Sequence, residues 1–348
     1  MIFTSLAALT LGLVATPPEP ATPALAVSTD LVFKPYKDWS ILLPNEQFAV
    51  VGEGIAFPHG RGDRLAARLE GTVLWLDRDG DGECEAKVEP LERGQTGLMV
   101  FRVPFGTDGE RTYAVRLASD GKWTYSASGA MVGEIAGTRV QIIDQNNNGR
   151  FGDVGEDAMI VGRGTTASFL SKVINVDGKL FDIGVAEDGS RIDYQPHEGP
   201  VGTLDLGSKH ASKALMRSVV VQSADGTISF DLSRAKDGLK MPAGDYIVHS
   251  GQVALGKSRA ELRTGRAKPV SVSAGETTTV EWGGPVAAEF AYHRRGDKLQ
   301  IGPSEIWYYG RQGEEYSNFM PLGSSPEFVI KDKKTGEVLV NAKFPGNC

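Results

Sequence analysis

Short apolar runs that alternate with polar positions recur along this chain, and turn residues separate them. Such runs cover residues 97–105, 111–118, 122–128, 173–176, 180–185 and 191–194. Successive side chains of a strand point to opposite faces, so a two-residue period predicts half-buried β-strands. The chain has eight Asp-Gly pairs, which are typical of tight hairpin turns, and no long run with helical periodicity. The pattern therefore predicts an all-β fold.

Changes in composition divide the 348 residues into four parts. An apolar and Pro-rich leader covers residues 1–26. A Gly-rich and basic stretch at residues 196–213 marks the junction between an N-terminal β region, 27–205, and a second one, 206–285. The remaining β segment, 286–348, is short for a complete sandwich and is either incomplete or shares strands with its neighbour. We expect a multidomain protein built of antiparallel β-sandwich-like units.

The leader has the features of an export signal. Residues 1–15 carry no charged side chain, and Ala24, Leu25 and Ala26 form a small-x-small cleavage site, which predicts a mature start near Val27. Cleavage after Ala15 is the alternative. No later segment has the roughly 18 apolar residues of a membrane span. We therefore expect a secreted, periplasmic or cell-surface protein without a transmembrane span.

Two loops carry oxygen-bearing side chains at alternate positions. The first, residues 77–83, follows an apolar run at 72–76, and the second, residues 144–150, follows one at 139–143. Residues one, three and five of such a loop can direct their oxygens to one point, as a hard divalent cation requires. A glycine at the sixth place lets the next backbone carbonyl, of Glu83 or Arg150, face the same ion. The side chains at the alternate positions are Asp77, Asp79, Asp81, Asp144, Asn146 and Asn148.

These loops resemble the first half of the EF-hand calcium loop and the loops of thrombospondin type 3 repeats. The resemblance implies calcium binding at each loop and no particular global fold. An EF-hand loop ends in a bidentate Glu at its twelfth position, where this chain has Val88 and Gly155. The flanking segments also read as strands. The closing carboxylate must therefore come from another position.

Several acidic residues stand close enough to close the two loops. Glu85 and Glu89 are the candidates for the first loop. Asp153, Glu156 and Asp157 are those for the second, and we favour Asp157 because it precedes another apolar run. Asp, Asn and Gly also form ordinary turns. Ordinary turns, however, do not need three such oxygens at alternate positions, so we expect structural calcium at both loops.

The segment 241–282 has a second resemblance. Its stretches PAGDYIV, residues 242–248, and VSVSAGETTTVEW, residues 270–282, look like closing strands of transthyretin-like or immunoglobulin-like sandwiches. This resemblance implies a β-sandwich for the second β region.

Composition excludes several classes of function. The net charge of −7 comes without a basic stripe, which argues against a nucleic-acid partner. Residues 251–258 match the phosphate-loop pattern, but no helix follows, so we expect a hairpin and no nucleotide. The five histidines show no metal-binding spacing. Only Cys84 and Cys348 are present, and whether they pair is left open.

Three classes of function remain. The leading one is a calcium-stabilised extracellular protein that acts in structure, adhesion or surface assembly, with a protein or polysaccharide partner. The second is a carbohydrate- or protein-binding module, for which Trp307 and Tyr308 exposed on one sheet face would be diagnostic. The third is a hydrolase with a dispersed carboxylate pair. The sequence favours a protein that is not an enzyme, because no linear catalytic motif is present.

Overall fold

The computed structural model describes residues 27–105, 109–296, 298–300, 302, 305–319 and 327–343. It is all-β, with 56% strand and no helix in the described part of the chain, and its sheets are mostly antiparallel. The predicted fold class is confirmed. The leader at 1–26 and Cys348 lie outside the described residues.

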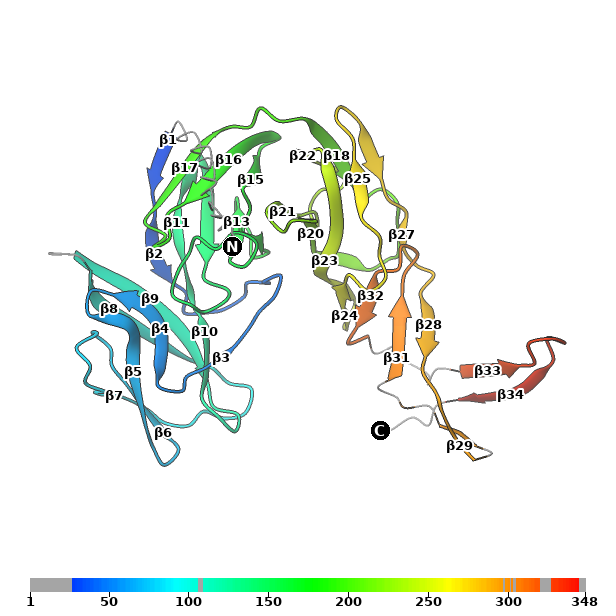
Figure 1. Cartoon of the computed structure of the whole chain (residues 1–348), viewed down its shortest axis with the longest axis horizontal. Coiled ribbons are helices and arrows are strands. Elements are labelled where there is room, and N and C mark those ends of the chain that lie inside the picture. Colours follow the sequence, from blue (N-terminus) through cyan, green and yellow to red (C-terminus); the bar gives the residue numbers. More distant parts are fainter. Residues whose placement is uncertain are drawn as a thin grey trace, which may run out of the picture.

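The strands of the first half, β1 to β17, gather on one side of the molecule (Figure 1). They form four sheets, with the orders β1-β17-β16-β15, β3-β10-β9-β8, β14-β13-β12-β11-β2 and β4-β5-β6-β7. Their bounds are β1 Val27–Asp30, β2 Val32–Pro35, β3 Ala49–Val50, β4 Gly54–His59, β5 Gly62–Glu70, β6 Val73–Leu76, β7 Ala86–Val88, β8 Gly97–Phe105, β9 Gly109–Ala118, β10 Thr124–Ala127, β11 Gly129–Ile135, β12 Thr138–Ile143, β13 Ala158–Val161, β14 Ser168–Phe169, β15 Val173–Val176, β16 Lys179–Val185 and β17 Arg191–Pro196.

One large apolar cluster fills the space between these sheets. It extends from Leu31 to Ile192 and draws side chains from strands of all four sheets. Phe57 of β4 stacks on Tyr113 of β9, with ring centroids 4.5 Å apart and an interplanar angle of 8°. Phe151 meets the same tyrosine edge-on. This aromatic group lies beside the second predicted calcium loop.

The second half of the chain, from β18 onward, makes a separate body. Its main sheet has the order β21-β20-β23-β24-β32-β31-β28, with β25 paired to β23, and smaller sheets are β22-β18-β26, β19-β27, β29-β30 and β33-β34. The bounds are β18 Val201–Asp205, β19 His210–Ala211, β20 Leu215–Ser223, β21 Ser229–Asp231, β22 Leu239–Pro242, β23 Gly244–Leu255, β24 Ser258–Arg263, β25 Val270–Val272, β26 Thr277–Thr279, β27 Trp282–Gly283, β28 Ala287–Phe290, β29 His293–Arg295, β30 Lys298–Gln300, β31 Ile306–Tyr309, β32 Glu315–Ser317, β33 Glu327–Lys331 and β34 Val338–Lys343.

A second apolar cluster lies within this body. Val219, Leu262 and Tyr316 contribute to it from one face of the main sheet. Trp282 closes it, and the indole nitrogen of this tryptophan donates a hydrogen bond to the Leu206 carbonyl at 2.5 Å. Strands β28, β31 and β32 join the main sheet, so part of the C-terminal segment shares a sheet with the second β region.

The two bodies touch along β14, β20 and β21. The Ser171 hydroxyl accepts a hydrogen bond from the Ser229 amide at 3.0 Å, and the Ser229 hydroxyl accepts one from the Phe169 amide at 3.3 Å. The Phe169 ring meets the His249 ring edge-on, with centroids 4.8 Å apart. Hydrogen bonds and a ring contact therefore join sheets whose strands do not pair with one another.

The stretch that matches the phosphate-loop pattern is a hairpin. Strand β23 pairs with β24 from Ser250↔Arg263 to Leu255↔Ser258, and Gly256 and Lys257 form the turn between them. Gly256 has a φ of +59°, the left-handed conformation that a two-residue hairpin turn requires. The expected hairpin is confirmed.

Burial of single side chains predicts their contribution to stability. Leu65, which is fully buried in the first cluster, is expected to lower the free energy of unfolding by about 2–5 kcal/mol when replaced by Ala. Leu215 is 73% exposed, so Leu215→Ala is the matched control and should change it by less than about 0.5 kcal/mol. Urea unfolding followed by tryptophan fluorescence measures both. Equal effects of the two substitutions would contradict this packing.

Candidate metal loops

The first loop begins where β6 ends. The Asp77 carboxylate lies inside it and accepts hydrogen bonds from the backbone amides of Asp79, Gly80 and Gly82 at 3.2, 2.7 and 2.9 Å. Gly80 and Gly82 have positive φ of +75° and +93°, a backbone conformation that is strained for residues with a side chain. The fourth and sixth positions of the loop therefore turn the backbone around the first aspartate.

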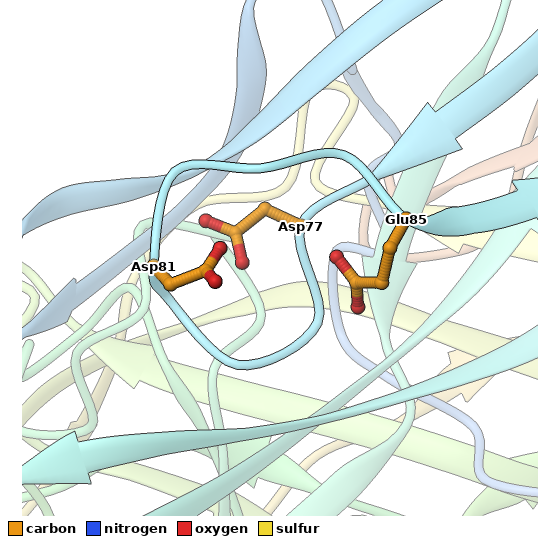
Figure 2. Close-up of side chains that lie close together, drawn as sticks. All are labelled: Asp77, Asp81 and Glu85. Carbon is orange, nitrogen blue, oxygen red and sulfur yellow. The ribbon is translucent and has the colours of Figure 1, made fainter.

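Three carboxylates of the first loop converge. Asp77, Asp81 and Glu85 each place an oxygen within 4.8 Å of the others, and Figure 2 shows them grouped at the loop. Asp77 is buried, whereas Asp81 and Glu85 are exposed. Such a group of oxygens could hold a metal ion.

The second loop follows β12 and repeats three of the hydrogen bonds of the first. Asp144 accepts from the amide of the sixth residue, Gly149, at 2.7 Å, as Asp77 does from Gly82. The third and fifth side chains each accept from the amide two residues further on in both loops. The fourth and sixth residues again have positive φ, +62° at Asn147 and +79° at Gly149. The two loops thus share one backbone conformation.

Asp144 lies in the interior of the first body. Its side chain is 0% exposed, and the Tyr113 hydroxyl donates a hydrogen bond to its Oδ2 at 2.6 Å. Burial and this nearby carboxylate raise the pKa of Tyr113 well above its usual value. The tyrosine therefore keeps its proton and acts as a donor to Asp144.

Polar side chains from both ends of the second loop meet. The Asn146 and Asn148 amides donate to Asp153 Oδ2 at 3.0 and 2.6 Å. The Asp153 backbone amide donates to Asp157 Oδ2 at 3.0 Å. The Oδ1 atoms of both asparagines each accept one backbone hydrogen bond and keep a second lone pair.

Asp157 is the least satisfied member of this group. The residue is 0% exposed, and its Oδ1 has no hydrogen-bond partner among the described residues. Burial and the charge of Asp144 raise the pKa of Asp157 to about 9, and burial raises that of Asp144 to about 6. Two carboxylates are therefore buried close enough to repel each other, and one oxygen is left without a donor.

Strand β4 runs between the two loops. A Cβ atom at Gly80 of the first loop would lie 3.1 Å from the His59 ring, at the end of β4. A Cβ at Gly149 of the second loop would lie only 2.5 Å from the Phe57 Cα. Both loops therefore pack on the same strand through glycines.

The structure brings together part of the residue set inferred from sequence. Asp77, Asp81 and Glu85 meet in the first loop, and the second loop gathers Asp144, Asn146, Asn148, Asp153 and Asp157. Asp79 and Glu83 lie outside the group of three, with exposed side chains. The Arg150 side chain pairs with Glu187. The predicted carbonyl ligands at Glu83 and Arg150 stay predictions.

The two alternative closing residues have other partners. Glu89 forms an ion pair with Lys87 at 2.7 Å, on the exposed side of β7. Glu156 is exposed and accepts a hydrogen bond from the Asn146 amide at 3.1 Å. Of the three candidates for the second loop, Asp157 is the one buried beside Asp144.

Two contributions were missed from the sequence. Tyr113 reaches Asp144 from β9, and no spacing in the chain connects the two. Asn147 was also overlooked, although its left-handed backbone and its buried amide, which donates to the Gln47 carbonyl at 3.0 Å, fix the loop in place. Asparagine tolerates this conformation better than most residues, and that was the available signal.

Comparison with protein-family models, curated proteins and solved structures gives no match for this chain. The chemistry of the loops is therefore the basis for any functional conclusion. Within the described residues, no helix is long and apolar enough to cross a membrane.

Packing of the second loop on β4 leads to a substitution test. Gly149→Ala is expected to destabilise the protein strongly, because it adds left-handed strain and forces a Cβ against the Phe57 backbone. Gly162 has a similar φ of +84° and open space around it, so Gly162→Ala should cost only the strain, about 1–2 kcal/mol. Thermal melts compare the two. A loss at Gly149 no larger than at Gly162 would contradict the close approach.

The buried carboxylates also predict a pH dependence of the metal-free protein. Asp144 and Asp157 keep protons in the folded state that the unfolded chain releases near its ordinary pKa of 3.8. In EDTA, these two groups therefore contribute their full stabilisation to the free energy of unfolding below about pH 4. This contribution is lost as the pH rises through about 6 and 9. Asp157→Asn should flatten the upper part of this fall. Chemical unfolding between pH 5 and 9 measures it, and a stability that rises with pH in both proteins would refute it.

Proposed function

We propose that this protein binds calcium at the second loop and at the first, and that the ions stabilise its β-sandwich framework. The wider role that we propose is structural, in adhesion or surface assembly outside the cytoplasm, with a protein or polysaccharide as partner. The export signal inferred for residues 1–26 supports that location.

The observation that carries this proposal is the Asp144–Asp157 pair. Burying one unpaired carboxylate is unfavourable, and burying two beside each other is more so. A divalent cation offsets both the repulsion and the lack of a donor at Asp157 Oδ1. Asn146 and Asn148, whose side chains bind Asp153 in the same loop, would supply further oxygens to such an ion.

The donor set favours calcium over other metals. The first loop offers carboxylate oxygens and the second offers carboxylate and amide oxygens, whereas zinc and copper prefer histidine or thiolate ligands. Cys84 beside the first loop is a poor thiolate, because burial and the charge of Asp77 raise its pKa. Calcium accepts six to eight oxygens in variable geometry, while magnesium requires a strict octahedron and sheds water reluctantly.

The first loop supports the proposal by its likeness to the second. Its triad of Asp77, Asp81 and Glu85 fits a hard divalent cation without being specific for calcium. The backbone conformation that it shares with the second loop is what extends the calcium assignment to it.

The other two classes of function gain less support. Trp307 and Tyr308 are neighbours on β31 and thus point to opposite faces, and Tyr308 packs on the second apolar cluster. They form no common platform. For a hydrolase, a pair of carboxylates with raised pKa outside the loops would be needed. Among the described residues Asp231 has a raised pKa there, and it is a single carboxylate held by the Ser233 hydroxyl.

Calcium is expected to stabilise the folded protein by mass action. A free ion concentration about a hundredfold above the dissociation constant should add roughly 2.7 kcal/mol per site. Thermal melts in EDTA and in excess calcium measure the increment, and magnesium at the same concentration should give a smaller one. Identical melting temperatures in all three buffers, with no heat of calcium binding by calorimetry, would refute the proposal.

Substitutions in each loop show how much of the calcium-dependent gain in stability comes from that loop. Asp157→Asn should remove the calcium increment of the second loop. It should also stabilise the protein in EDTA at pH 8, because the folded state then no longer has to hold a proton on Asp157 that the unfolded chain has released. The double substitution Asp77→Ala with Asp79→Ala should remove the calcium-dependent stabilisation that comes from the first loop. Asp237→Asn, at an exposed site away from both loops, is the control and should change neither. A calcium increment that survives Asp157→Asn unchanged would exclude Asp157 as a ligand.

A further inference from the structure

The hairpin of β33 and β34 has little support from the rest of the described chain. Its two strands pair with each other and with no other described strand. The apolar clusters found among the described residues include no residue of either strand. Figure 1 shows the hairpin reaching away from the sheets of the second body. An isolated two-stranded hairpin is marginally stable in water, and further strands or a packed face are needed to stabilise it.

Apolar side chains of this hairpin are exposed. Val329 of β33 is 45% exposed, and Val338 and Leu339 of β34 are 53% and 58% exposed. Neighbouring exposed apolar residues of this kind mark surfaces that bind another protein. The exposure and the lack of neighbours together indicate that the hairpin docks on a partner.

The free edge of β33 carries backbone groups that β34 does not use. The Asp332 amide, directly after this strand, donates a hydrogen bond to the Glu337 carbonyl across the hairpin at 2.8 Å. Successive residues of an antiparallel strand turn their amides and carbonyls to opposite edges. Those of Glu327, Val329 and Lys331 therefore face away from β34. Such a row is a template for one more strand.

The charges of β33 fit a second copy of the same strand. Its sequence is EFVIK, with Glu327 at one end, Lys331 at the other and Val329 in the middle. When two copies run antiparallel about Val329, each Glu327 lies opposite Lys331 of the other copy. Directly opposed unlike charges stabilise a pair of strands, and like charges destabilise it. Parallel pairing in register would set each charge against its like.

The backbone and the charges favour the same register. Antiparallel pairing about Val329 sets the outward residues of one strand against those of the other, so that their amides meet carbonyls. A shift by one residue would set outward groups against inward ones. A shift by two would separate Glu327 from Lys331 of the second copy. One register therefore satisfies both requirements.

Glu327 already has one partner within its own chain. Lys343 Nζ lies 2.9 Å from Glu327 Oε1 across the hairpin. The two side chains are 61% and 55% exposed, so the carboxylate stays open to a second cation. In the paired strands Glu327 would lie between Lys343 and Lys331 of the second copy, and the charges along this row would alternate.

The outer edge of β34 is less suited to pairing. The register runs from Ile330↔Val340 to Lys331↔Val338, so Leu339 is an extra residue on β34. Such a bulge bends the strand and interrupts its row of backbone groups, which is one way in which edge strands avoid further pairing. Pairing through β33 therefore gives a closed dimer with a four-stranded sheet, and not an open fibre.

We propose that this protein forms a two-fold symmetric dimer in which the β33 strands of two copies pair antiparallel about Val329. The contact is short, so the dimer is weak and depends on concentration. This inference goes beyond calcium binding, because no residue of either loop takes part in the contact.

Sedimentation of the full chain over a range of concentrations tests the dimer. A monomer–dimer equilibrium is expected, with similar dissociation constants in calcium and in EDTA. A chain that stays monomeric at submillimolar concentration, or that assembles without limit, would overturn the proposal. Dimers without calcium binding by calorimetry would leave this inference standing while the proposed function fails.

Charge reversal locates the contact. Lys331→Glu sets negative charges against each other and Glu327→Lys sets positive ones, so each variant alone should dimerise about tenfold or more weakly. Mixing the two variants opposes unlike charges again and should give a heterodimer within about threefold of the original affinity. Lys257→Glu makes the same change at an exposed turn of the β23–β24 hairpin and is the matched control, which should dimerise normally. Single variants that dimerise as well as the original, or a mixture without heterodimer, would refute the contact.

A backbone variant tests the strand pairing itself. Because the Val329 amide faces the free edge, Val329→Pro removes a donor between the copies and none within the hairpin. It should abolish the dimer while the melting temperature of the monomer stays close to that of the original chain. A dimer of unchanged affinity in this variant would show that the copies meet through another surface.

Discussion

The burial of two carboxylates, Asp144 and Asp157, is the constraint around which the first body is organised. Neither side chain reaches solvent, and one of their oxygens, Asp157 Oδ1, accepts no hydrogen bond from the described residues. Hydrogen-bond donors near the two carboxylates partly offset the cost of burying them. Tyr113 and the backbone amides of the loop serve Asp144, and the Asp153 amide serves Asp157. These contacts link strand β9 and the end of β12 to one polar centre inside an apolar cluster.

That polar centre also connects distant parts of the chain. Tyr113 stacks on Phe57, so the same ring that donates to Asp144 fills the core between sheets. Gln145 and Asn147, the loop residues that face away from the carboxylates, hold the segment that leads from β2 to β3. The loop is thus one of several attachments of this long connection, beside the backbone hydrogen bonds of Leu42 with Thr165 and Ala167.

Much of the fold could be predicted from local pattern. Alternation and Asp-Gly turns located strands such as β8 and β15, because both signals act between neighbours in the chain. The order of strands within each sheet could not be predicted in this way, because pairings such as β1 with β17 join residues that are far apart along the chain. The same division holds at the loops. Alternate oxygens and the sixth glycine indicated where the loops lie, whereas the burial of Asp144 and Asp157 depends on side chains, such as Tyr113, that only the folded chain brings near.

Strand β4 has a consequence for both loops. It contacts the fourth residue of one loop through His59 and the sixth residue of the other through Phe57. A Cβ at Gly149 would collide with the Phe57 backbone, and a Cβ at Gly80 would press on the His59 ring. Both loops therefore share one packing partner, so a displacement of β4 would disturb the two loops at once, although they lie far apart in the sequence.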